Sequence, residues 1–281
     1  MTTDALKRMT PIDDNYNFPD AVKPPLDRDS LRDVIDLALW AGQLMLAHGA
    51  DTARIEETTH RVGTALGATW MDILVSPNAV VITTTSGEEF RTKVRRVVAL
   101  GVNMAILDAV NALSRRIESG EWDRVAVRRE LERIGAMRHD YPRWLIAAAV
   151  GAACAGFSRL FGGDGGAFAV TFAAAGIAML VRQALQHRHF NALIAIIPTA
   201  FTAGMIAASG VHFGMTATPE PALAASVLLL VPGVHLINAM RDLLMGHIVT
   251  GLVRGVTGAL ISVCIAIGML LALGALGIQG F

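Results

Sequence analysis

The sequence predicts a membrane protein in which an N-terminal cytoplasmic α+β domain precedes an all-α bundle of five transmembrane helices. The first observation is the distribution of charge, because only eight of the 24 basic and 24 acidic residues lie after position 144. A surface exposed to lipid excludes ionised side chains, which are costly in hydrocarbon. The second is a set of five apolar stretches in this back half, each near the length of about 20 residues that spans a bilayer. The third is a front half in which helical and alternating apolar patterns follow one another.

We predict that residues 1–28 form a disordered lead-in, because they are polar and contain Pro11, Pro19, Pro24 and Pro25. They hold no apolar core typical of a signal peptide, so we expect the next domain to remain in the cytoplasm. The net charge of +0 gives no reason to propose a nucleic-acid partner.

We predict that residues 29–140 form the cytoplasmic domain. Ser30 and Asp33 form a capping-box pattern at the start of a first helix, and Gly49 suits a left-handed cap at its end. Asp51 or Thr52 begins a second helix that reaches about 66. Runs rich in β-branched residues predict a small antiparallel sheet of two or three strands, at 70–76, 80–85 and 90–98. Two more helices are expected at about 102–118, with Val102 facing inward, and at about 122–134.

Residues 141–281 predict the membrane bundle, with spans at about 144–161, 166–182, 190–211, 219–240 and 255–277. The loops 182–189 and 241–254 contain four arginines, and the loops 162–165 and 211–219 contain none. Because positive loops stay inside, the C-terminus is expected outside. Many Ala and Gly residues predict close helix contacts, either within the chain or with a partner, which includes a second copy of the chain in a homo-oligomer.

The segment from Leu230 to Asp242, LVPGVHLINAMRD, carries the strongest functional signal of the bundle. A Pro-Gly step inside a span can expose backbone groups, as the discontinuous helices of transporters do, and polar groups at membrane depth usually line a path. The candidate path residues are Pro232, Gly233, His235, Asn238, Arg241 and Asp242. The alternatives are a simple kink, a cytoplasmic helix end and an interior histidine with satisfied hydrogen bonds.

A second set of charged residues lies in the cytoplasmic domain: Asp51, Arg54, Glu56, Glu57, Arg91, Arg95 and Arg96. They predict a carboxylate-binding or gating surface, with a merely solvated charged face as the alternative. Cys154 and Cys264 lie in apolar runs without metal-ligand spacing, so neither a metal site nor a cofactor is expected. The chain has no P-loop or dinucleotide fingerprint, which argues against an ATP-driven pump.

Several runs together resemble the threonine/serine exporter family. They are HGADTARIEET at 48–58, VSPNAVVITT, RTKVRRV, VNALSRRIESG and LVPGVHLINAMRDLLMGHIVTGLVRG, and their order covers about residues 30–280. The resemblance implies a bacterial-type inner-membrane exporter rather than an enzyme. It also implies the longer chain of a split, two-part type with a small all-membrane partner. Threonine, serine or a dicarboxylate such as succinate would be the small-molecule substrate, and the sequence does not separate these.

The mechanism that this resemblance favours is secondary export. The substrate carboxylate would meet Arg241 or the half-helix N-terminus near Gly233, and His235 or Asp242 would carry protons. Two alternatives stay open at this point. One is a membrane-anchored hydrolase that uses the acidic and basic cluster with His60, and the other is an accessory membrane subunit.

Overall fold

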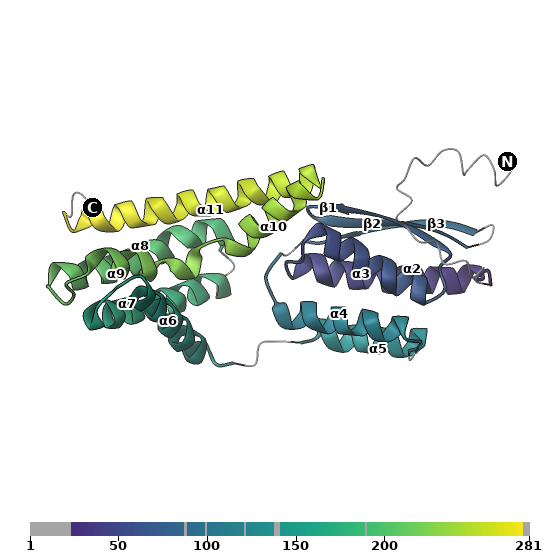
Figure 1. Cartoon of the computed structure of the whole chain (residues 1–281), viewed down its shortest axis with the longest axis horizontal. Helices are drawn as coiled ribbons and strands as arrows, with labels where there is room; N and C mark the ends of the chain where they lie inside the picture. The colour runs from purple at the N-terminus through teal and green to yellow at the C-terminus, as the bar shows by residue number, and fades with distance from the viewer. Residues whose placement is uncertain are drawn as a thin grey trace.

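The computed structural model describes residues 24–277 except 87–88, 99, 121, 138–140 and 189. An α+β domain and a helical bundle lie end to end along the long axis (Figure 1). The predicted lead-in lies mostly outside the described residues. At its end, Leu26 donates its N–H to Ser86 Oγ at 2.7 Å and packs on the core of the domain. The ordered domain therefore begins before position 29.

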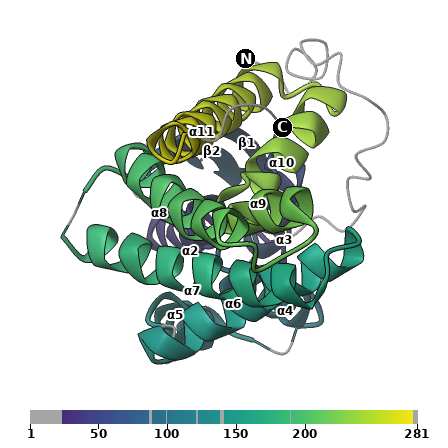
Figure 2. The ribbon, with the colours of Figure 1, turned by 90° about the vertical axis from the view of Figure 1, so that its left-hand side faces the viewer.

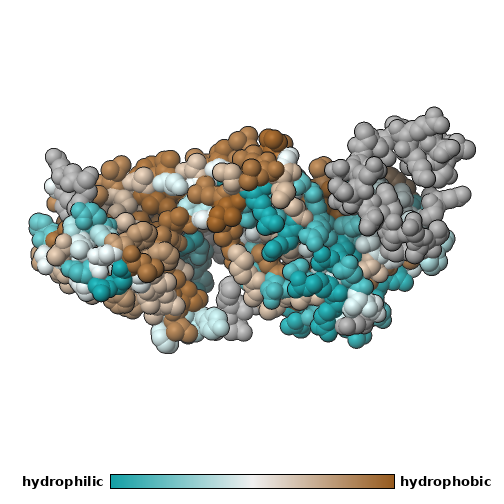
Figure 3. All heavy atoms as spheres, viewed as in Figure 1, coloured by the Kyte–Doolittle hydropathy of each residue, from teal (hydrophilic) through white to brown (hydrophobic). Residues whose placement is uncertain are grey.

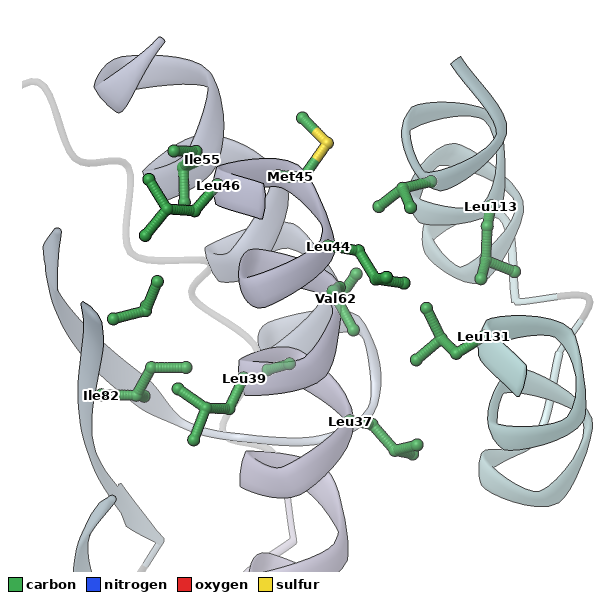
Figure 4. Close-up of a cluster of buried hydrophobic side chains, with 14 of the residues drawn as sticks. Leu37, Leu39, Leu44, Met45, Leu46, Ile55, Val62, Ile82, Leu113 and Leu131 are labelled. Carbon is green, nitrogen blue, oxygen red and sulfur yellow. The ribbon is translucent and has the colours of Figure 1, made fainter. Parts of the chain in front are cut away.

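Helix α2 (Arg28–Ala47) forms the centre of the domain, because it is apolar on nearly every side. Figure 4 shows it between the sheet, which contributes Ile82, and two helices that contribute Leu113 and Leu131. The predicted capping box at Ser30 is wrong. Asp27 takes the extended backbone of an N-cap, so Ser30 lies inside the first turn.

The α2–α3 turn follows the sequence prediction. Gly49 has φ +93°, the left-handed conformation that glycine adopts without strain. Asp51 then caps α3 (Thr52–Ala65) by accepting the Arg54 N–H at 3.1 Å. Helices α4 (Met104–Glu118) and α5 (Arg124–Gly135) pack on α2. Asn103 caps α4, so Val102 precedes the helix and is 45% exposed instead of facing inward.

The sheet is an antiparallel meander of β1 (Trp70–Ser76), β2 (Ala79–Ser86) and β3 (Glu89–Arg96). In its register Ile73 lies opposite Ile82, and Val81 lies opposite Val94. Alternate residues of β2, such as Val80, are buried toward α2, while the other face is open to solvent. β3 ends at Arg96 and not at 98, because its partner β2 begins opposite that residue.

The bundle contains α6 (Arg143–Leu160), α7 (Gly165–His187), α8 (Ala192–His212), α9 (Pro219–Ser226), α10 (Gly233–Leu244) and α11 (Ile248–Ala275). Figure 2 shows these helices from their end. Neighbours approach closely at small residues. A Cβ on Gly268 of α11 would lie 2.6 Å from the carbonyl oxygen of Ile197 on α8. On the face shown in Figure 3, hydrophobic residues gather over the bundle and hydrophilic residues over much of the α+β domain.

Within the described residues, three helices are long and apolar enough to cross a membrane: α7, α8 and α11. The segment Pro219–Leu230 and α10 are bent by 68° at a short break between them. Together they make a fourth span if both belong to the same crossing of the membrane. The predicted span 219–240 is interrupted between Leu230 and Gly233, at the Pro-Gly step, because Pro232 has no N–H with which to continue the helix. Helix α6, of 18 residues, is not among these candidates.

Two other predicted boundaries also move. α11 begins at Ile248 and not at 255, and α7 continues to His187 and not to 182. Arg254 and Arg182 consequently lie inside helices and not in loops. An arginine interrupts an apolar run in the sequence and so suggests the end of a membrane helix. The helix can nevertheless continue through an arginine whose guanidinium is hydrogen-bonded or reaches the membrane surface.

Candidate functional site

The hairpin of α10 and α11 reaches past the bundle and meets the α+β domain near β1 and the α2–α3 turn (Figure 1). We call this contact the joint. It is formed by residues 49–56 of the α2–α3 turn and α3, residues 238–242 of α10 and residues 247–254 around the start of α11. The paired residues are as many as 204 positions apart in the sequence.

Asp242 lies at the centre of the joint and is 1% exposed. Its carboxylate accepts the backbone N–H of Thr52 at 2.9 Å and Nη1 of Arg254 at 2.7 Å. Arg254 also donates from Nη2 to the carbonyl oxygen of Ala50 at 2.8 Å. The N-terminus of α3 further favours a negative charge at this position. The buried carboxylate is thus compensated by a guanidinium and by a helix end that belongs to the other part of the molecule.

Two weaker contacts surround this pair. Asn238 donates from Nδ2 to the carbonyl oxygen of Gly49 at 2.8 Å. Nη1 of Arg241 lies 3.3 Å from Oδ2 of Asp51. Arg241 is 48% exposed, so this ion pair adds little stability. The joint is therefore held mainly by its buried centre.

Glu56 and His247 form the edge of the joint. Oε2 of Glu56 lies 3.7 Å from Nε2 of His247, and each side chain is 26% exposed. Burial raises the pKa of Glu56, His247 opposes this shift, and the charges of Asp242 and Asp72 add to it. This edge is the part of the joint where a carboxylate and an imidazole face each other.

The break between the segment Pro219–Leu230 and α10 lies deeper in the bundle. Val231 and Pro232 separate the two helical segments. The N–H of Gly233, the first residue of α10, donates to the carbonyl oxygen of Val231 at 2.9 Å, and the next two N–H groups of α10 have no intrahelical partners. Arg182 of α7, which is partly exposed, donates from Nη1 to the carbonyl oxygen of Leu229 at 3.3 Å. His235 lies on the side of α10 that faces Gly258 of α11. A cationic side chain and a helix N-terminus are thus close to the break.

Asp164 ties together the loops at the end of the bundle away from the domain. Its carboxylate accepts the N–H of Ala167 at 2.6 Å, the N–H of Ala217 at 2.8 Å and the hydroxyl of Thr216 at 2.7 Å. These hydrogen bonds lower the pKa of Asp164 to about 2. The clamp links the α6–α7 loop to the α8–α9 loop.

The joint unites residues from both sets that the sequence singled out. Asp51 and Glu56 come from the domain set, and Asn238, Arg241 and Asp242 come from the bundle set. The bundle set is therefore divided, with three members at the joint and the remaining three at the break: Pro232, Gly233 and His235.

The other domain candidates have different surroundings. Arg54 is exposed, and the exposed Glu57 pairs with Arg61 along α3. On β3, Arg91 and Arg95 point toward α2, where Arg95 donates to Gln43 at 3.2 Å, and Arg96 is exposed on the opposite face. The structure does not place these five residues at the joint contacts described above.

Sequence reasoning missed Thr52, His247 and Arg254 as members of the joint. A signal for Arg254 was available, because it is a lone cation in an apolar run twelve residues after the lone anion Asp242. Thr52 contributes its backbone, which no side-chain pattern reveals. Across the described ranges, no group of three or more His, Cys, Asp or Glu side chains is placed to hold a metal ion.

Comparison with known proteins places both parts of the chain in one family. The sequence matches the family described as "Putative threonine/serine exporter" over residues 36–276. It is 38% identical to "Probable succinate transporter subunit YjjP" of Klebsiella aerogenes, over 91% of this chain and 98% of that protein. The protein of the same name from Escherichia coli is 36% identical, over 91% of this chain and 100% of its own length.

A more distant relative, "Probable threonine/serine exporter" of Mycobacterium tuberculosis, is 25% identical over 86% of this chain but only 46% of its own length. No solved structure shows significant similarity. The family match includes the α2–α3 turn, the break and both sides of the joint. The chain belongs to the threonine/serine exporter family.

Proposed function

We propose that this chain is a subunit of a secondary exporter that moves small carboxylate-bearing metabolites across a bacterial inner membrane. Family membership and the names of the relatives, which are those of transporters, support this function. The observation that carries it is the break between Leu230 and Gly233, where the span bends by 68°. Discontinuous helices of this kind form substrate sites in transporters because they free backbone groups inside the bilayer.

The substrate that we favour is a dicarboxylate such as succinate, with threonine or serine as the second choice. The relatives named as succinate transporter subunits are 36–38% identical to this chain, whereas the one named a threonine/serine exporter is 25% identical. At the break, a carboxylate would meet the N–H groups of the second and third residues of α10 and the guanidinium of Arg182. That guanidinium has N–H donors beyond the one bonded to Leu229. Arg241, the arginine that the sequence favoured, faces Asp51 at the joint instead.

The topology that fits this function has five crossings: α6, α7, α8, the bent pair and α11. Helix α6, with 18 residues, is about 27 Å long, close to the thickness of the hydrocarbon layer. The α10–α11 hairpin, which carries Arg241 and Arg254, reaches the α+β domain, and Arg182 and Arg188 lie at the C-terminal end of α7. The positive-inside rule then places this domain in the cytoplasm and the C-terminus outside.

A second membrane subunit completes the proposed exporter. The relatives from K. aerogenes and E. coli are named as subunits and match this chain over nearly their whole length. More than half of the M. tuberculosis relative lies outside its match to this chain. We propose that a small all-membrane protein supplies the corresponding part here.

An enzymatic role has less support. The hydrolase that the sequence left open would use the domain's carboxylates with His60. Asp51 and Glu56, however, face α10 and α11 at the joint, and Glu57 pairs with Arg61. The names of the family and of the relatives are also those of transporters.

Export is tested in a strain of the host that lacks this gene but keeps its other membrane proteins. Cells are preloaded with labelled succinate, threonine or serine, and efflux is compared after complementation with the wild type, Arg182→Ala or Arg188→Ala. We expect the wild type to restore efflux of one substrate class. Arg182→Ala should abolish it at normal membrane levels, and Arg188→Ala, at the exposed end of α7, should not. Unchanged efflux of all three compounds in the deletion strain would reject this function and favour an accessory role.

A further inference from the structure

Glu56 and His247 come from different parts of the molecule and meet only when the joint is closed. Glu56 lies in α3 of the α+β domain, and His247 precedes α11 of the bundle. Their side chains are 3.7 Å apart, a distance at which an ion pair forms once the imidazole is protonated. The contact therefore exists in a charged and an uncharged form.

The other charges of the joint are already paired. Arg254 is bonded to Asp242 and Ala50, and Arg241 faces Asp51. Two further carboxylates, Asp242 on α10 and Asp72 on β1, act on Glu56 with the same sign of charge. His247 is thus the group that offsets the negative charge of Glu56 at this edge of the joint.

Both groups favour a closed joint when protons are available. A histidine side chain changes its charge within the physiological pH range, and a protonated imidazole at this distance attracts the carboxylate of Glu56. Closure partly buries Glu56, and this burial raises its pKa above the ordinary value of 4.5. A carboxyl with a raised pKa stabilises the closed state at low pH and loses that contribution as the pH rises through its pKa. Rising pH therefore opens the joint through both groups.

We propose that the Glu56–His247 pair makes docking of the α+β domain onto α10 and α11 depend on pH, with firmer docking at mildly acidic than at alkaline pH. The protons that the pair takes up or releases are exchanged with the surrounding water. The effect on export rests on the proposed function, because it requires that α10, which begins at the break, moves with the domain. The effect on docking does not.

Thr52 provides a reporter for the joint that needs no transport assay. Its N–H donates to Asp242 across the joint, its side chain is fully buried, and its hydroxyl has no hydrogen-bond partner among the described residues. Thr52→Cys is therefore a substitution of similar size that removes no side-chain hydrogen bond. A thiol at this position becomes reactive when the domain separates from the hairpin.

The experiment uses full-length protein in membranes, carrying Thr52→Cys with Cys154→Ala and Cys264→Ala. Maleimide labelling is measured from pH 5.5 to pH 8, and each rate is divided by that of the denatured protein at the same pH. We expect the corrected rate to rise about 5-fold across this range, which is typical of one partly exposed ion pair. His247→Gln and Glu56→Gln should each flatten the profile.

Glu57→Gln is the matched control, because Glu57 is the adjacent, exposed carboxylate that pairs with Arg61. It should keep the pH profile of the parent. A flat profile in the parent, or a profile that both His247→Gln and Glu56→Gln leave unchanged, would overturn the proposal. Efflux is measured separately, so a failure of the proposed function leaves the labelling result interpretable.

Discussion

The guanidinium of Arg254 lies 2.7 Å from the carboxylate of Asp242 within one helical hairpin, yet each residue also bonds the backbone of the α2–α3 turn. The same ion pair thus holds α10 to α11 and holds both helices to the α+β domain. Because Asp242 is almost fully buried, these partners and not water compensate its negative charge.

Removal of Arg254 is expected to destabilise the joint strongly. Arg254→Ala leaves a buried carboxylate without its cation, which costs about 3–5 kcal/mol. Arg241→Ala removes a half-exposed pair and should cost less than about 1 kcal/mol. Thermal unfolding of the purified protein in detergent compares the two variants. The double variant Asp242→Ala/Arg254→Ala should recover part of the stability that Arg254→Ala loses. A double variant whose loss of stability equals the sum of the two single losses would contradict this account.

Gly251 is expected to be sensitive to the smallest substitution. A Cβ there would lie 3.0 Å from both the carbonyl oxygen of Ala239 and the N of Leu243, and these backbone atoms cannot rotate away. Gly251→Ala should therefore push α11 from α10 and cost about 1–3 kcal/mol in thermal unfolding. Gly255→Ala is the control, since its Cβ would meet only the Ala239 side chain at 3.7 Å. Equal melting temperatures for the two variants would rule out a tight contact at Gly251.

Asp164 is expected to give the far loops a pH dependence of opposite sign to that of the joint. Its pKa is lowered to about 2, so its stabilising contribution is present above its ordinary pKa of 3.8 and is lost as the pH falls from about 4 toward 2. Asp164→Asn should lower the melting temperature at pH 7, and the difference from the wild type should disappear near pH 2. Circular dichroism in detergent measures both proteins. A difference that persists at pH 2 would mean that the charge of Asp164 is not the cause.

Pro232 is expected to keep the span bent. Pro232→Ala restores an N–H and removes the ring, so the two segments can join into one straighter helix. Spin labels on the exposed positions Glu220 and Leu244 should then lie farther apart, and efflux should fall at normal membrane levels. Pro198→Ala in α8, where the helix continues through the proline, should change neither. An unchanged label distance in Pro232→Ala would show that tertiary packing alone sets the bend.

Much of the α+β domain follows from the sequence. The alternating pattern of β2 and the turn glycine Gly49 give the sheet and the α2–α3 turn within a few residues. The error at Ser30 arose because Asp27, three residues earlier, is an equally good capping residue, and only the backbone decides between them.

The joint could be predicted only in part. Helical spacing placed Asn238 and Asp242 on one side of α10, which is correct, but periodicity does not say which surface that side meets. Contacts such as the one from Asn238 to Gly49 span 189 positions and use a backbone oxygen as one partner. Local patterns contain no trace of such a contact. Only the complete fold brings the two residues together.

The order of synthesis gives the joint a further consequence. Its first half, around Ala50, emerges from the ribosome 204 residues before Arg254, an interval of roughly 10–40 s at ordinary rates of translation. The α+β domain has time to fold while the turn that receives Arg254 is still uncovered. Docking of the last helical hairpin is then the final step of assembly, and a chain truncated before Asp242 leaves the N-terminus of α3 without the carboxylate that accepts the N–H of Thr52. Quality-control proteases would meet this open surface on unfinished chains, whereas a docked hairpin covers it in the finished protein.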